Sequence, residues 1–304
     1  MTTAAVLSGY ALLTGTAAPY LLARARWLHR APAAAITAWL GLAATFVVSG
    51  ALACYHLLLT EPHVHDGLVG LLTACGLVTG SPARGAPPTP VDLAAVLLPA
   101  ALVLLPALCL TRISWRAHRT RRRQRDMLAL VGTPSPRYGA TIVEHEVPAV
   151  YCLPGRAPRI VVTSGALRAL SDEQLRAVLA HEDAHIKGRH HLVHAAVAAF
   201  ARAFPFLPLA RLVQEQTALL LEMAADDRAL RGHPREALAA AMYEVAAGQT
   251  PHLAMGAGGS GSLIRMRRVL DPPPKPRRAT TPAIVLTSSA APLLPLLLAC
   301  GPMP

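Results

Sequence analysis

Two histidines and a glutamate stand close together in the middle of the chain, in His181-Glu182-Asp183-Ala184-His185. In a helix, a spacing of four residues places His181 and His185 one turn apart on the same face. Two neutral imidazoles on one face can bind a single zinc ion, and Glu182 projects beside them, where it can take a proton from a water on the metal. This HExxH pattern predicts a hydrolytic zinc site with Glu182 as its general base.

A third ligand has to come from elsewhere, because a catalytic zinc ion takes three protein ligands and keeps one position for water. Glu222 is the best candidate, since it interrupts an apolar helical stretch in which an unpartnered carboxylate would be costly to bury. The alternative is a surface carboxylate paired with Arg228. One turn later, Asp226 can accept a hydrogen bond from the outer nitrogen of a ligand histidine, and Asp227 could serve instead. We expect one Zn²⁺ per chain.

The elements around this motif predict a small α+β domain. Ser171-Asp-Glu-Gln174 is typical of a capping box at the start of the helix that carries the histidines. The pattern stays helical to about Val245, with interruptions at prolines and glycines. Three stretches rich in β-branched residues predict a small antiparallel sheet before the helix, at residues 141–146, 149–153 and 159–163.

The remainder of the chain is too apolar for an ordinary soluble protein. Of 304 residues, 53% are hydrophobic and 15% are charged, and the mean hydropathy is +0.39. In soluble domains about 45–50% of the residues are apolar and about 25% are charged. No basic residue precedes the first apolar stretch, so we expect an uncleaved span and not a signal peptide. Four stretches are long enough to cross a bilayer, at residues 4–23, 33–59, 93–110 and 283–300.

The arginines predict the orientation of these spans. They follow the first and third stretches, with seven between residues 112 and 125, and basic residues also precede the fourth stretch. The positive-inside rule then places both termini outside and the zinc domain in the cytosol of a bacterial-type cell, in a multi-pass plasma-membrane protein. The predicted division is a membrane region at 1–111, a zinc domain at 112–281, and a last span with a short tail at 282–304.

The net charge of +12 has a membrane explanation. Aromatic residues make up only 4% of the chain, and the arginines adjoin apolar stretches, so we expect contact with anionic lipid and no direct nucleic-acid partner. The spans contain no Asp, Glu, Lys or Arg, which argues against a transporter or channel.

Three segments resemble the membrane-embedded zinc metallopeptidases of the BlaR/MecR type and, more distantly, the HtpX and Ste24 group. They are residues 170–190, Phe204-Pro-Phe-Leu-Pro208 and Glu222-Met-Ala-Ala-Asp226, and the resemblance extends over about 147–270. It implies zinc bound by His181, His185 and Glu222, Glu182 as general base, and peptide hydrolysis. The implied fold is a mainly α membrane protein with four transmembrane helices and a cytosolic, gluzincin-like α+β domain between the third and fourth.

The arrangement of spans bears on the subgroup. HtpX-type enzymes are expected to have two spans before the zinc domain and two after it, whereas three before and one after favours the BlaR/MecR type. The extracellular penicillin-binding sensor domain of that type has no counterpart here, so we do not expect a β-lactam sensor. Gly188-Arg-His-His191 also stands where the family often has Arg-Arg-Asp.

Other basic and histidine residues have simpler interpretations. His190, His191 and His194 are predicted to line a solvated or interfacial helix face, in preference to a second metal site. The segment Arg265-Met-Arg-Arg268 resembles a basic segment late in the family's catalytic domain, with a lipid-facing patch as the alternative.

These features predict an integral-membrane zinc endopeptidase that cleaves protein or peptide substrates at the cytosolic membrane face. The substrate would lie along the edge of the sheet at residues 159–163, and His233 is a candidate oxyanion donor. A BlaI-type repressor is the precedent for a regulatory substrate, and membrane-protein quality control of the HtpX type is an alternative. A zinc-stabilised signalling module without hydrolysis is a further alternative, against which the intact Glu182 argues.

Overall fold

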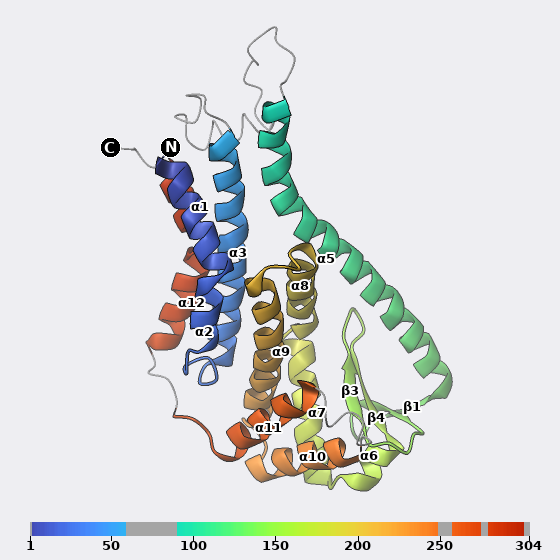
Figure 1. Cartoon of the computed structure of the whole chain (residues 1–304). Coiled ribbons are helices and arrows are strands. Elements are labelled where there is room, and N and C mark those ends of the chain that lie inside the picture. Colours follow the sequence, from blue (N-terminus) through green and yellow to red (C-terminus); the bar gives the residue numbers. More distant parts are fainter. Residues whose placement is uncertain (1, 59–89, 249–256, 275–278, 301–304) are drawn as a thin grey trace.

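The computed structural model describes residues 2–58, 90–248, 257–274 and 279–300 (Figure 1). Its helices and strands, in chain order, are α1 (Thr2–Gly15), α2 (Ala17–Ala23), α3 (Pro32–Leu58), α5 (Pro90–Val131), β1 (Gly132–Ser135), β2 (Ala140–Val143), β3 (Val150–Leu153), β4 (Arg159–Thr163), α6 (Ser164–Ala169), α7 (Asp172–Lys187), α8 (His190–Ala203), α9 (Pro208–Ala229), α10 (Arg235–Gly248), α11 (Ala257–Leu270), α12 (Thr280–Ala290) and α13 (Leu293–Cys300).

Three helical segments are long and apolar enough to cross a membrane, at Thr3–Ala23, Pro32–Leu58 and Leu93–Val131. They correspond to the first three predicted spans. In the region of the fourth, α12 and α13 meet at a bend of 44°, so a fourth span exists only if this bent pair counts as one. Pro292 lies at the break, and its missing N–H and fixed ring prevent a regular helix from continuing.

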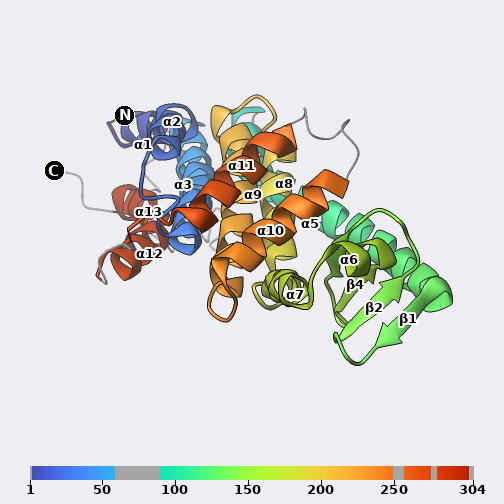
Figure 2. The ribbon, with the colours of Figure 1, turned by 90° about the horizontal axis from the view of Figure 1, so that it is seen from below.

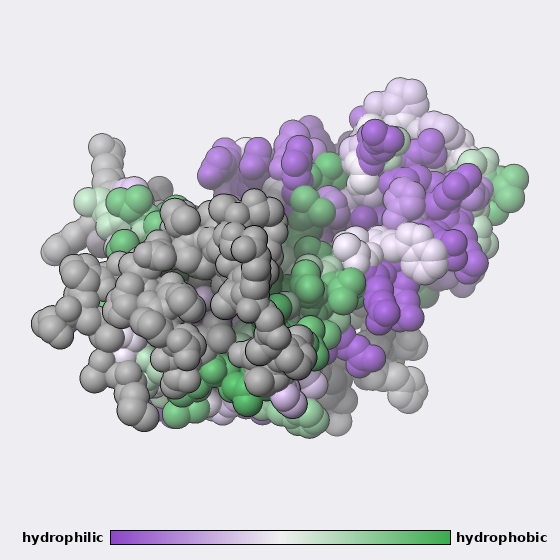
Figure 3. All heavy atoms as spheres, turned by 90° about the horizontal axis from the view of Figure 1, so that it is seen from above, coloured by the Kyte–Doolittle hydropathy of each residue, from purple (hydrophilic) through white to green (hydrophobic). Residues whose placement is uncertain are grey.

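α5 continues well beyond the apolar stretch that predicted it. Its 42 residues measure roughly 63 Å at 1.5 Å per residue, about twice the thickness of a bilayer core. The helix bends away from the bundle, and prolines at 99 and 106 lie inside it (Figure 1). Its second half carries the seven arginines, and hydrophilic residues gather on that side of the molecule when it is seen from above (Figure 3). The predicted boundary between residues 111 and 112 therefore falls within one continuous helix.

The sheet differs from the predicted one in two respects. Its strand order is β1-β2-β4-β3, and β2 pairs with β4 in parallel, so the prediction of a purely antiparallel sheet is wrong. β1 was also not predicted; it pairs antiparallel with β2. The reason is the chain path: β3 and β4 form a hairpin, and β4 then inserts between β3 and β2.

This order also decides which strand has a free edge. β4, residues 159–163, has a partner on each side, so the prediction that it offers unpaired backbone to a substrate is wrong. The edge strands are β1 and β3, and of these two β3 packs against α7. Seen from below, α7 lies between the sheet on one side and α9 and α10 on the other (Figure 2).

The largest hydrophobic cluster joins α3 to the helices of the zinc domain. Trp39 of α3 is fully buried in the same cluster as Leu220 and Met223 of α9. α9 therefore packs directly against a helix long and apolar enough to cross a membrane. The helix that carries Glu222 is thus positioned by the membrane region itself.

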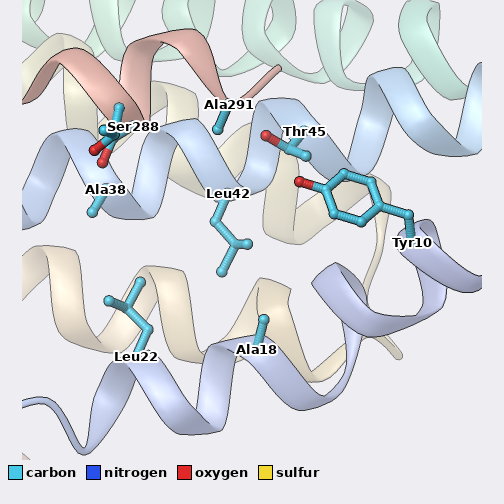
Figure 4. A pocket seen from close by; sticks show the side chains of 9 residues that line it. Tyr10, Ala18, Leu22, Ala38, Leu42, Thr45, Ser288 and Ala291 are labelled. Carbon is cyan, nitrogen blue, oxygen red and sulfur yellow. The ribbon is translucent and has the colours of Figure 1, made fainter. Parts of the chain in front are cut away.

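A cavity of about 290 Å³ lies among α1, α2, α3 and α12, as Figure 4 shows. Its walls combine small and apolar side chains with a few hydroxyl groups: Tyr10, Ala18, Leu22, Ala38, Leu42, Thr45, Thr287, Ser288 and Ala291. Beside it α12 approaches α3 so closely that a Cβ atom at Gly41 would collide with the Ser288 carbonyl. None of the HExxH residues lines this cavity.

Candidate metal centre

α7 presents the HExxH motif, and its start is the predicted capping box. Ser171 Oγ accepts from the Gln174 N–H at 3.3 Å, and Gln174 Oε1 accepts from the Ser171 N–H at 2.8 Å. The helix is buried on more than one side, at Leu175, Ala177, His181 and Ala184, and His185, one turn after His181, is partly buried. The cap fixes the start of the helix, and packing against α9 directs both imidazoles toward Glu222.

The structure brings His181, His185 and Glu222 together. The two Nε2 atoms lie 3.1 Å apart, and Glu222 oxygens lie 3.5 Å from His181 Nε2 and 3.4 Å from His185 Nε2. A tetrahedral ion with bonds of about 2.0–2.1 Å separates its ligand atoms by roughly 3.3–3.4 Å. The spacing and the donor types therefore fit one zinc ion. Among the described residues, His181, His185 and Glu222 form the one group of donor atoms that could hold a metal ion.

α9 supplies both Glu222 and the partner of the first histidine. Asp226, one turn after Glu222, is fully buried, and its Oδ1 lies 2.9 Å from His181 Nδ1. The opposite ring nitrogen of His181 is the one that faces His185 and Glu222. Asp227, the alternative left open by the sequence, instead pairs with Arg268 at 2.7 Å.

Arg265 on α11 belongs to the basic segment noted in the sequence, but its contact with the site was not predicted. Its Nη1 lies 2.7 Å from Glu222 Oε2, and its Nε and Nη2 donate to the two oxygens of Asp226 at 2.9 Å each. Glu222 therefore pairs with Arg265, not with Arg228 as the alternative supposed. Arg265 and Arg268 are both largely buried, so the alternative of a lipid-facing patch is wrong for these two residues.

A sequence signal for this contact existed. Two adjacent acids on α9, Asp226 and Asp227, match two arginines three residues apart on α11, at 265 and 268. The signal is weak because 39 residues separate Arg265 from Asp226 and no local periodicity connects them.

Glu182 lies against the edge strand of the sheet. Burial raises its pKa, partly offset by the neighbouring His181 and by a hydrogen bond from the Cys152 thiol of β3. Burial and the Glu182 carboxylate together raise the pKa of Cys152 to about 12, so this thiol stays protonated at neutral pH and can donate. Glu182 therefore has a neutral thiol of β3 beside it.

The two histidines have opposite protonation tendencies. Burial lowers the pKa of His181, but hydrogen bonds with Asp226 and Glu222 outweigh it and raise the pKa to about 9. Burial dominates at His185 and lowers its pKa to about 4. Burial also acts to raise the pKa of Glu222, yet the contacts with His181 and Arg265 bring it down to about 2. At neutral pH Glu222 is ionised and His185 neutral, as metal ligands must be.

The three histidines after the motif have different surroundings. His190 is partly buried, and its Nδ1 lies 2.8 Å from Nδ1 of His185, a contact that was not predicted. His194 is exposed, as predicted, and His191 is partly buried. His233, the candidate oxyanion donor, lies in the turn between α9 and α10.

A helix with an HExxH motif that faces a glutamate on a helix packed against it defines a site of the zinc-hydrolase class. Comparison with known proteins agrees: residues 114–256 match the model of Peptidase family M48. The matched residues include α7 and α9, the helices that carry the three candidate metal ligands.

Two curated relatives are each named Protease HtpX homolog. The one from Persephonella marina is 42% identical over 79 residues, which cover 25% of this chain and 26% of that protein. The one from Thermococcus kodakarensis is 38% identical over 82 residues, which cover 26% of this chain and 27% of that protein. The matched part thus spans about a quarter of the length of these relatives. No solved structure matches the chain.

Proposed function

We propose that this protein is a membrane-bound zinc endopeptidase. The observation that carries the proposal is the group of His181, His185 and Glu222, whose donor atoms have the separations of a tetrahedral zinc site. Glu182 follows the first of these residues on the same helix, where a general base is needed. The apolar helices α1, α2, α3 and α5 support a location in a membrane.

His181, His185 and Glu222 would hold the zinc ion. When bound, zinc lowers the pKa of water toward about 7 and polarises a carbonyl group. Glu182 takes the proton from the attacking water and later gives it to the leaving amine. Asp226 keeps the proton of His181 on Nδ1, which leaves Nε2 free to act as a ligand.

The substrate would bind as an extended strand along β3. β3 pairs with β4 on one side only, so the backbone groups of its other edge are free to pair with a peptide. Cys152 of β3 lies close enough to Glu182 for the two groups to shift each other's pKa, so a peptide beside β3 passes close to the base. Backbone pairing reads no particular side chain, and this favours protein substrates of varied sequence.

The orientation follows from the distribution of arginines. With four spans, counting α12 and α13 as one, both termini lie outside and the zinc domain lies at the cytosolic face. Residues 1–111 and 282–304 then form the membrane part, and residues 112–281 form the peptidase domain. The arginines of α5 lie where they can contact anionic lipid headgroups.

The physiological role follows one of two precedents. The names of the two relatives support an HtpX-type protease, for which membrane-protein quality control is the expected role. The order of apolar helices, three segments before the zinc domain and a bent pair after it, favours the BlaR/MecR type and a BlaI-type repressor as substrate. We place the HtpX-type role first because sequence identity supports it directly.

The decisive experiment for hydrolysis is Glu182→Gln in the purified full chain, with an unfolded protein as substrate. Glutamine has nearly the same shape but cannot accept the proton, so hydrolysis should fall by about two to four orders of magnitude. Zinc content should not change. Asp183→Asn is the matched control, because Asp183 is the next residue and pairs with Lys187 on the outer face of α7.

Two outcomes would contradict the proposal. Full hydrolysis by Glu182→Gln would remove Glu182 as the base. If instead a cellular output persists in Glu182→Gln and disappears in His181→Ala, the domain is a metal-stabilised binding module that does not act by cutting.

A further inference from the structure

Both ring nitrogens of His185 have a neighbour. Nε2 lies 3.1 Å from Nε2 of His181 and faces the candidate metal position. Nδ1, on the opposite side of the ring, lies 2.8 Å from Nδ1 of His190, the first residue of α8. The rings of His185 and His190 are nearly perpendicular, at 87°, with centroids 4.7 Å apart. This edge-on arrangement directs one nitrogen at the other.

The turn between α7 and α8 is built to bring His190 to this place. Arg189 has a left-handed backbone, with φ of 49°. Among the described residues it is the only non-glycine residue with a positive φ. Such a conformation is unfavourable for a residue with a Cβ atom and persists only where surrounding contacts impose it. Gly188 precedes it, and a Cβ atom there would collide with the imidazole of His190.

The chemistry of a ligand histidine explains what this turn achieves. The nitrogen that binds a metal has no proton, so the other nitrogen carries one and needs an acceptor. For His181 the acceptor is Asp226. For His185 the nearest polar atom on that side is Nδ1 of His190, at 2.8 Å. A neutral imidazole with its own proton on Nε2 can accept there.

We infer that His190 is the positioning residue of His185: its Nδ1 accepts the Nδ1–H of His185 and so holds His185 Nε2 toward the metal. This inference rests on the proposed zinc site. The two ligand histidines of α7 thus have different outer partners, a carboxylate for His181 and an imidazole for His185.

The test is the zinc dissociation constant of the full chain in detergent, measured by competition with a chromophoric chelator. His190→Phe keeps a ring but removes the acceptor, and zinc binding should weaken about 10–100-fold. His190→Asn places its side-chain oxygen near the position of Nδ1, and it should restore most of the affinity. His194→Phe, one turn later on α8 and exposed, is the matched control and should bind zinc like the wild type.

Gly188→Ala provides an independent route to the same contact. Its methyl group would push the His190 ring away, so this variant should lose zinc affinity to a similar degree. Combining Gly188→Ala with His190→Phe should then add little, because both changes remove one interaction.

The outcomes separate this inference from the zinc site on which it rests. Wild-type zinc affinity in His190→Phe, or no recovery in His190→Asn, overturns the positioning role. If His185→Ala also keeps its zinc, the metal site itself is wrong. Loss of zinc in His185→Ala with wild-type affinity in His190→Phe would leave the site standing and remove only His190.

Discussion

Arg265 and Asp226 lie 39 residues apart in the chain, and two parallel hydrogen bonds of 2.9 Å join them. The same guanidinium contacts Glu222, and Asp226 in turn contacts His181. One arginine therefore connects the candidate third ligand to the partner of the first. It also supplies positive charge beside two carboxylates that lie one turn apart on α9 and would otherwise repel each other.

We predict that Arg265→Gln weakens the metal centre. The buried Asp226 and the partly exposed Glu222 would both lose their counter-charge, and breaking the buried Arg265–Asp226 pair costs about 3–5 kcal/mol. The free energy of unfolding should fall, and hydrolysis per folded molecule should fall by roughly 10–100-fold. Chemical unfolding and a peptidase assay measure the two effects.

Arg268→Gln is the control for Arg265→Gln. Arg268 lies on the same helix and is similarly buried, but it pairs with Asp227 and donates to the carbonyl of His29. The Arg268→Gln variant should have a lower free energy of unfolding, while its folded molecules keep the zinc affinity of the wild type. Equal losses of zinc affinity in both variants would mean that Arg265 acts only by holding α11 in place.

Metal analysis should find one zinc ion per chain in the wild type. His185→Ala and Glu222→Ala should each lose it, because two remaining ligands hold zinc poorly. His194→Ala should retain it, since His194 lies on the exposed side of α8. Full zinc in Glu222→Ala would exclude that residue as a ligand.

Zinc affinity should increase with pH up to about 9. The zinc-free His181 has a pKa raised to about 9, so below that pH a proton must leave the imidazole before zinc can bind. The apparent dissociation constant should therefore fall about tenfold for each pH unit between 7 and 9. Calorimetry in buffers of different ionisation enthalpy would count the released proton.

Asp226→Asn tests the origin of this pH dependence. The amide removes a charge that favours the protonated His181, so the pKa of His181 should fall and the slope between pH 7 and 9 should flatten. An unchanged slope would assign the released proton to another group.

Thiol labelling of intact cells should report the orientation. A cysteine introduced at Ser81, between the second and third spans, should react with an impermeant reagent. One at Glu173, exposed at the start of α7, should react only after permeabilisation. The parent chain gives the background from native cysteines, and the reverse pattern would overturn the orientation inferred from the arginines.

Features that depend on near neighbours in the chain could be predicted from sequence. The helical spacing of His181 and His185, the capping box at Ser171 and the first three apolar helices agree with the structure because each follows from a local period or a composition. Glu222 could be singled out for a similar reason, as a charge inside an apolar helical stretch.

Only the tertiary structure decided which distant groups meet. The sequence predicted strands but not that β4 would lie between β2 and β3, because strand order depends on the path of the whole chain. Arg265 could not be placed, since its partners lie on a helix far away in sequence. His190 is close in sequence to His185, but their contact requires a left-handed backbone at Arg189. Arginine carries no sign of that conformation; packing imposes it, and packing exists only once the helices have assembled.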